Sequence, residues 1–135
     1  MRFRNLDLGK LILRVTCGGL LLLHGSNSAI HGIQHIRDMV RNAGLPEFIS
    51  YGNLVGEVVA PLFLIAGYKT RIAALVIAFN MLMSVLIAHR DIMFSRNDFG
   101  GWMIELNVFY FMTAIAVFLL GAGKFSLSRG VGNWD

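Results

Sequence analysis

Residues 50–89 read SYGNLVGEVVAPLFLIAGYKTRIAALVIAFNMLMSVLIAH, and they contain two long apolar stretches separated by a short polar turn. The first stretch covers about residues 50–68 and the second about residues 71–89. A helix that crosses a membrane needs about 20 consecutive, mostly apolar residues. This part of the chain therefore predicts two antiparallel transmembrane helices joined by a tight turn.

Two more apolar stretches lie on either side of this hairpin, at about residues 11–30 and 102–122. The whole chain of 135 residues is 56% hydrophobic and only 15% charged, whereas about 25% of the residues in a soluble domain are charged. The sequence thus predicts an all-α fold, a single domain over residues 1–135 that forms an integral membrane four-helix bundle.

The segment between the first two apolar stretches is polar and amphipathic. Its apolar residues recur at helical spacing, which predicts a short helix lying in the membrane interface; they are Ile33, Ile36, Met39 and Val40. Gly-Leu-Pro at residues 44–46 is expected to end this helix before the next span begins.

Basic residues predict the orientation, because cytoplasmic loops of membrane proteins carry an excess of lysine and arginine. One side of the predicted bundle holds seven of them: Arg2, Arg4, Lys10, Lys69, Arg71, Lys124 and Arg129. The other side holds four: Arg37, Arg41, Arg90 and Arg96. Both termini are therefore predicted to be cytoplasmic. The basic residues are scattered between apolar runs and form no stripe, which argues against nucleic-acid binding.

Several polar residues interrupt the apolar stretches, where ionisable groups are costly and usually face the bundle interior. At 1.5 Å rise per residue, His24 lies about 20 Å from the cytoplasmic boundary and Glu57 about 10 Å below the outer surface. In a core about 30 Å thick these two residues share one level. Glu105 and His89 are expected near the same outer side. The sequence thus predicts that His24, Glu57, Glu105 and His89 converge.

Such a cluster could exchange protons or bind a polar headgroup, because imidazole titrates near neutrality and burial raises the pKa of a carboxylate towards the same range. A quinone headgroup needs a hydrogen-bond donor at each carbonyl and a proton route when it is reduced. The alternative is structural: a hydrogen bond between His24 and Glu57 could simply hold two membrane helices together.

The other polar residues suggest weaker assignments. Arg14 is expected to extend towards the cytoplasmic lipid headgroups, with a structural role as the alternative, and the same two roles are open for Asn80. His31 and His35 share a helical spacing, but no carboxylate accompanies them, so no metal site is predicted. Cys17 is the only cysteine, which excludes a dithiol redox pair within the chain.

Short motifs spread over nearly the whole chain resemble the DoxX family of small bacterial membrane proteins. The matching pieces are LGKLILR at residues 8–14, His24-Gly25, Gly-Leu-Pro at 44–46, GEVVAPLFLIAGYKTRIAAL at 56–75, Glu105, and GAGKFSLSR at 121–129. The chain departs from the family at Ser28, where a lysine is common, and at Ser128, where an aspartate is usual.

The resemblance implies a four-helix bundle in the bacterial cytoplasmic (inner) membrane and an association with redox enzymology. Relatives include a subunit of a thiosulfate:quinone oxidoreductase and a membrane anchor for sulfurtransferase and superoxide dismutase partners. Two hypotheses follow. In the first, the chain is a subunit of an oxidoreductase that interacts with quinone and receives electrons from a partner. In the second, it is a non-catalytic scaffold or assembly factor for soluble redox enzymes or sulfurtransferases. Catalysis by the chain itself and a homo-oligomeric state stay open.

Overall fold

A computed structural model describes residues 2–135, and the fold is all-helical, with no strand in this part of the chain. The first helix is α1 (Arg2–His31), which is followed by the short α2 (Gln34–Asn42). One continuous helical segment, Glu47–Ala66, comes next. It consists of η1 (Glu47–Ile49), α3 (Ser50–Leu54), the π turn η2 (Val55–Val59) and α4 (Ala60–Ala66). The chain then continues through α5 (Thr70–Ala88), η3 (Arg90–Ile92) and α6 (Glu105–Leu120).

Each of the four predicted apolar stretches forms a helix over most of its length, although the fourth begins at Glu105, three residues later than predicted. Among the described residues, two segments are long and apolar enough to cross a membrane, namely Glu47–Ala66 and Thr70–Ala88, whereas α6 is a shorter apolar helix. The amphipathic segment forms α2, and Gly44, with φ of 74°, lies in the turn that follows it. The first helix is longer than expected, because it begins nine residues before the predicted apolar stretch at residue 11.

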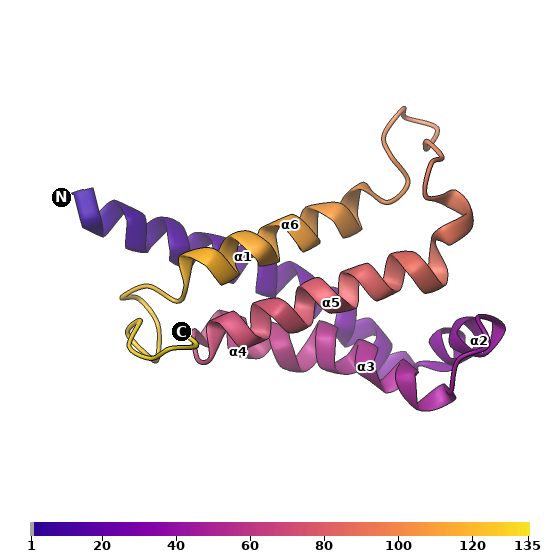
Figure 1. The fold of residues 1–135 in the computed structure, drawn as a ribbon, viewed down its shortest axis with the longest axis horizontal. Coiled ribbons are helices and arrows are strands. Elements are labelled where there is room, and N and C mark those ends of the chain that lie inside the picture. The colour runs from indigo at the N-terminus through magenta and orange to yellow at the C-terminus, as the bar shows by residue number, and fades with distance from the viewer. Residues whose placement is uncertain (1) are drawn as a thin grey trace.

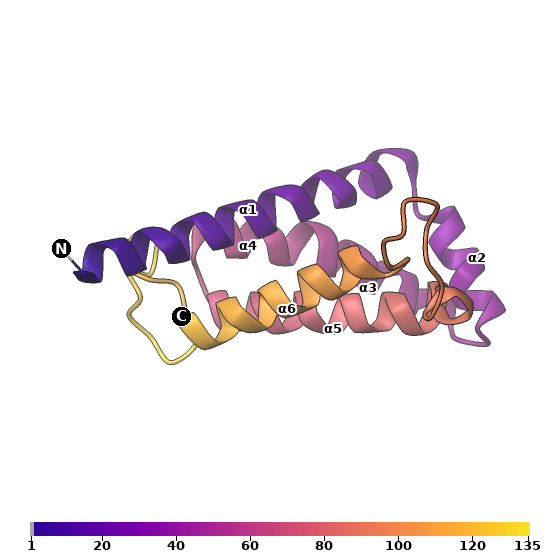
Figure 2. The ribbon, with the colours of Figure 1, turned by 90° about the horizontal axis from the view of Figure 1, so that it is seen from above.

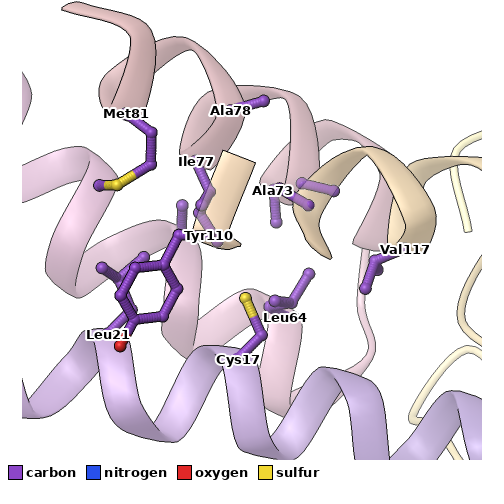
Figure 3. Packing of buried hydrophobic residues seen from close by; sticks show 12 residues of the cluster. Cys17, Leu21, Leu64, Ala73, Ile77, Ala78, Met81, Tyr110 and Val117 are labelled. Carbon is purple, nitrogen blue, oxygen red and sulfur yellow. The ribbon is translucent and has the colours of Figure 1, made fainter. Parts of the chain in front are cut away.

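Four long helical segments lie side by side (Figures 1 and 2). The helix α5 packs against both α6 and α4, while α1 packs against α4, η2 and α6. Their common core holds many small side chains, which let helix backbones approach closely. Figure 3 shows part of this core, which consists of Cys17, Leu21, Ala60, Leu64, Ala73, Ala74, Ile77, Ala78, Met81, Tyr110, Ala114 and Val117.

The outer surface of the helices is strongly apolar. Leu23, Phe79 and Leu119 are each more than 60% exposed, and they come from three different helices. Soluble monomers rarely expose large contiguous apolar surfaces, whereas a lipid-facing surface carries such side chains without cost. The surface thus suits a hydrocarbon environment.

The start of α1, the turn after α4 and the C-terminal segment 121–135 meet at one end of the molecule (Figures 1 and 2). Lys124 donates its backbone N–H to the carboxylate of Asp7 at 3.2 Å. Leu127 likewise donates its N–H to the carbonyl of Ala66 at 3.0 Å. These three basic segments therefore meet at one end of the molecule, and α2 lies at the opposite end.

Candidate functional site

Arg14 is fully buried, so the expectation that it reaches lipid headgroups is wrong. Its guanidinium donates to the carbonyls of Leu64 at 2.8 Å, Ile65 at 3.1 Å and Phe125 at 2.6 Å. The last turn of a helix leaves carbonyls without intrahelical partners, and the end of α4 offers two of them within reach of Arg14. The planar fork of donors holds both carbonyls, together with the C-terminal segment.

His24 and Glu57 lie on neighbouring helices, as expected, and the contact between these helices is made by Gly25. A Cβ atom added to Gly25 would lie 2.2 Å from the carbonyl oxygen of Glu57. Only glycine therefore allows α1 to approach the π turn η2 this closely. No ion pair or hydrogen bond joins the two side chains within the described part of the chain.

The imidazole of His24 is exposed and oriented by its own helix. Its Nδ1 lies 3.2 Å from the carbonyl oxygen of Leu20, one turn earlier. Because a carbonyl can only accept, a hydrogen bond at this contact requires the tautomer that carries its proton on Nδ1. The ring also meets Tyr110 edge to face, with 6.2 Å between ring centroids. Tyr110 is buried, and its hydroxyl points towards α1 (Figure 3).

Glu57 lies in the middle of the π turn η2, four residues before Pro61. In an α-helix the carbonyl of Glu57 would accept from the N–H of residue 61, but proline has no N–H. The helix is widened here, and Ala60 donates its N–H to Val55, five residues earlier. Single π turns of this kind are frequent at functional sites. The Glu57 carbonyl, without its usual donor, faces Gly25.

Asn53 and Asn80 add two amides near Glu57. Asn53 lies one turn before Glu57 and donates to its carboxylate at 3.0 Å. Asn80 of α5 packs against Gly56, where an added Cβ would lie 2.4 Å from the Asn80 side chain. The buried Nδ2 of Asn80 has no hydrogen-bond partner among the residues described.

Both amides line a cavity of about 460 Å³ between α2, α3, η2 and α5. Its walls are mostly apolar and include Met39, Phe79 and Ile87. Small-molecule sites in proteins have this character, being apolar pockets of about 300–1,000 Å³ with a few polar groups that fix orientation. The cavity is thus large enough for a quinone headgroup, and Asn53 links it to Glu57 through one hydrogen bond.

The recorded contacts of Glu105 and His89 are with residues other than His24 and Glu57. The exposed carboxylate of Glu105 stands at the first residue of α6, beside Gly101. The half-buried ring of His89 follows α5, with Nδ1 3.2 Å from the carbonyl oxygen of Ser84. No described hydrogen bond or ion pair joins either residue to His24 or Glu57.

The described residues contain no group of three or more histidine, cysteine, aspartate or glutamate side chains that could hold a metal ion. His31, one of the two histidines that share a helical spacing, has its Nδ1 3.1 Å from the carbonyl oxygen of Asn27.

Sequence reasoning missed Asn53 and the cavity. The signal for Asn53 was its position four residues before Glu57, because side chains at this spacing share one helix face. The cavity could not be foreseen, since α2 closes one of its sides and the docking of that helix does not follow from its own periodicity.

The DoxX family model matches residues 9–90 of the chain. This range covers Arg14, His24, Glu57 and every residue that lines the cavity of about 460 Å³. No curated protein and no solved structure matches the chain.

Proposed function

Because the chain belongs to the DoxX family, whose members are membrane proteins associated with redox systems, we propose that it is the quinone-binding membrane subunit of such a system. The observation that carries this proposal is the cavity of about 460 Å³ that is lined by Asn53 and Asn80, of which Asn53 donates a hydrogen bond to Glu57. A quinone combines an apolar tail and ring with two carbonyl acceptors, and this cavity offers apolar walls and amide donors.

Each polar group then has a role. Asn80 Nδ2, buried and without a partner, donates to one quinone carbonyl. Glu57 supplies protons as the quinone is reduced, and His24, exposed on the neighbouring helix, exchanges protons with Glu57 through its imidazole. Reduction of a quinone to a quinol takes two electrons and two protons. The electrons come from a partner, because the single cysteine of this chain cannot form a dithiol pair.

The membrane arrangement belongs to the same proposal. The four helical segments form a four-helix bundle that spans the bacterial inner membrane several times, with both termini in the cytoplasm. The end that carries Lys10, Lys69 and Lys124 then faces the cytoplasm, where a soluble redox enzyme or sulfurtransferase docks.

The tight packing between the helices favours the second candidate function, a non-catalytic scaffold. The glycine contacts at Gly25 and Gly56 and the three carbonyl contacts of Arg14 lock the helices and the C-terminal segment together. In a scaffold, Glu57 and Asn80 would contribute to this packing only, and no quinone would bind.

The test is equilibrium binding of a short-chain quinone to the protein in nanodiscs, with wild type compared with Asn80→Leu and Glu57→Gln. Loss of the Asn80 donor is expected to weaken binding about tenfold, which corresponds to about 1.4 kcal/mol. The matched control is Asn27→Leu on the exposed face of α1, which is expected to bind like wild type. Absence of saturable binding to the wild-type protein would overturn the quinone proposal in favour of the scaffold.

A further inference from the structure

The connection between α5 and α6 displays two phenylalanines to the surroundings. We call residues 90–104 the aromatic loop. Phe94 is 92% exposed and Phe99 is 98% exposed, the two highest values among the large apolar side chains of the described residues. Burial of a phenylalanine ring is strongly favourable. Two highly exposed rings on the same loop therefore indicate that another surface covers them.

The aromatic loop is held in shape by its own hydrogen bonds. The side-chain oxygen of Asn97 accepts from the N–H groups of Phe99 at 3.1 Å and Gly101 at 2.8 Å. Met103 donates its backbone N–H to the carbonyl of Ser95 at 3.1 Å, and Arg96 and Trp102 form an antiparallel bridge. The two phenylalanines are therefore displayed on a folded turn.

The position of the loop indicates which surface covers it. The loop follows α5, a helix long and apolar enough to cross a membrane, and it leads into the apolar α6. In Figures 1 and 2 it projects sideways from the ends of these helices, across their axes. A loop that runs across the axes of membrane helices stays near the depth at which those helices end, which is the membrane interface.

We propose that the aromatic loop is a membrane-interface anchor, with Phe94 and Phe99 inserted among the lipid headgroups and upper acyl chains of the adjoining leaflet. Its two arginines and two aspartates, Arg90, Asp91, Arg96 and Asp98, cancel in formal charge. Insertion therefore depends on the aromatic rings and requires no anionic lipid. The proposal rests on the membrane location of the chain and is independent of quinone binding.

The experiment measures the depth of a fluorescent label in vesicles of phosphatidylcholine. Phe94→Cys and Phe99→Cys are each made with Cys17→Ser and carry an environment-sensitive nitrobenzoxadiazole label. Asn133→Cys, in the exposed C-terminal segment, serves as the water reference, and Met112→Cys, on the exposed face of α6 and outside the cavity, serves as the acyl-chain reference. All four positions have exposed side chains, so labelling leaves the core intact.

The labels at residues 94 and 99 are expected to show blue-shifted emission, quenching by nitroxides placed near the lipid headgroups, and protection from aqueous iodide. High salt should leave this pattern unchanged. Iodide quenching equal to that at residue 133 would overturn the proposal. Protection from iodide without lipid quenching, increasing with the protein-to-lipid ratio, would also overturn it, because the loop would then be covered by a second copy of the chain.

Discussion

At the scale of single residues, Gly25 determines how closely α1 can lie against the π turn that carries Glu57. An added Cβ would lie 2.2 Å from the Glu57 carbonyl oxygen and 2.8 Å from the Glu57 Cβ, so backbone would have to move. Gly19, on the same helix, has nothing within 4 Å of an added Cβ. Alanine substitutions at these two glycines therefore separate the effect of close helix contact from the effect of helix propensity.

We expect Gly25→Ala to lower the free energy of unfolding by about 1–3 kcal/mol, as overpacking in a tight contact does. Gly19→Ala should instead be neutral or stabilise the protein by up to about 1 kcal/mol, because alanine is the better helix former. Thermal unfolding in detergent, followed by circular dichroism, measures both. Equal stabilities of the two variants would mean that α1 and η2 are not in close contact.

The level of His24 and Glu57 could be estimated from the sequence, because helical rise converts residue number into depth. The structure brings their helices together at Gly25, while the depth itself stays a prediction. The partners of Arg14 could not be predicted in this way. One of them, the Phe125 carbonyl, lies 111 residues away in a segment without helical periodicity. Because every residue has a backbone carbonyl, the sequence does not indicate which carbonyl Arg14 binds.

At the scale of the elements, the hairpin of residues 50–89 is well predicted, since unbroken apolar runs and a short polar turn leave few other arrangements. The π turn is not predicted, because Pro61 indicates only that a helical hydrogen bond is missing. The shape of the aromatic loop is not predicted either, because it depends on hydrogen bonds that the Asn97 side-chain oxygen accepts from backbone N–H groups of the loop.

Arg14 connects three elements, and its removal should affect them together. In Arg14→Met the carbonyls of Ile65 and Phe125 lose their donor, and unsatisfied buried groups cost about 1–3 kcal/mol each. We expect a lower free energy of unfolding and faster amide hydrogen exchange in residues 125–131. Arg14→Lys should fall between Arg14→Met and wild type, because one ammonium group cannot reproduce the planar fork of donors.

The matched control is Arg90→Met, which removes an exposed arginine at the opposite end of the molecule and should change stability by less than about 0.5 kcal/mol. If hydrogen exchange in residues 125–131 stayed at the wild-type rate in Arg14→Met, the C-terminal segment would be held by its other contacts, such as the Asp7–Lys124 bond.

At the scale of the whole molecule, the fold places the start of α1, the turn at residues 67–69 and the segment 121–135 at one end, and the aromatic loop at the other (Figure 1). Seven lysines and arginines belong to the first end by sequence and four to the second. Lysine and arginine are enriched on the cytoplasmic side of membrane proteins. The first end, which has more of them, is therefore expected to be cytoplasmic.

Cysteine accessibility in whole cells tests this orientation, and the chain suits the test because Cys17 is buried and should not react. Ser95→Cys, in the aromatic loop, should react with a membrane-impermeant maleimide in intact cells. Asn133→Cys, at the opposite end, should react only after the cells are permeabilised. The reverse pattern would place the basic end outside, and the docking of a cytoplasmic enzyme there would then be untenable. Labelling of both positions in intact cells would show that the two ends are not separated by a membrane, which would contradict the spanning arrangement itself.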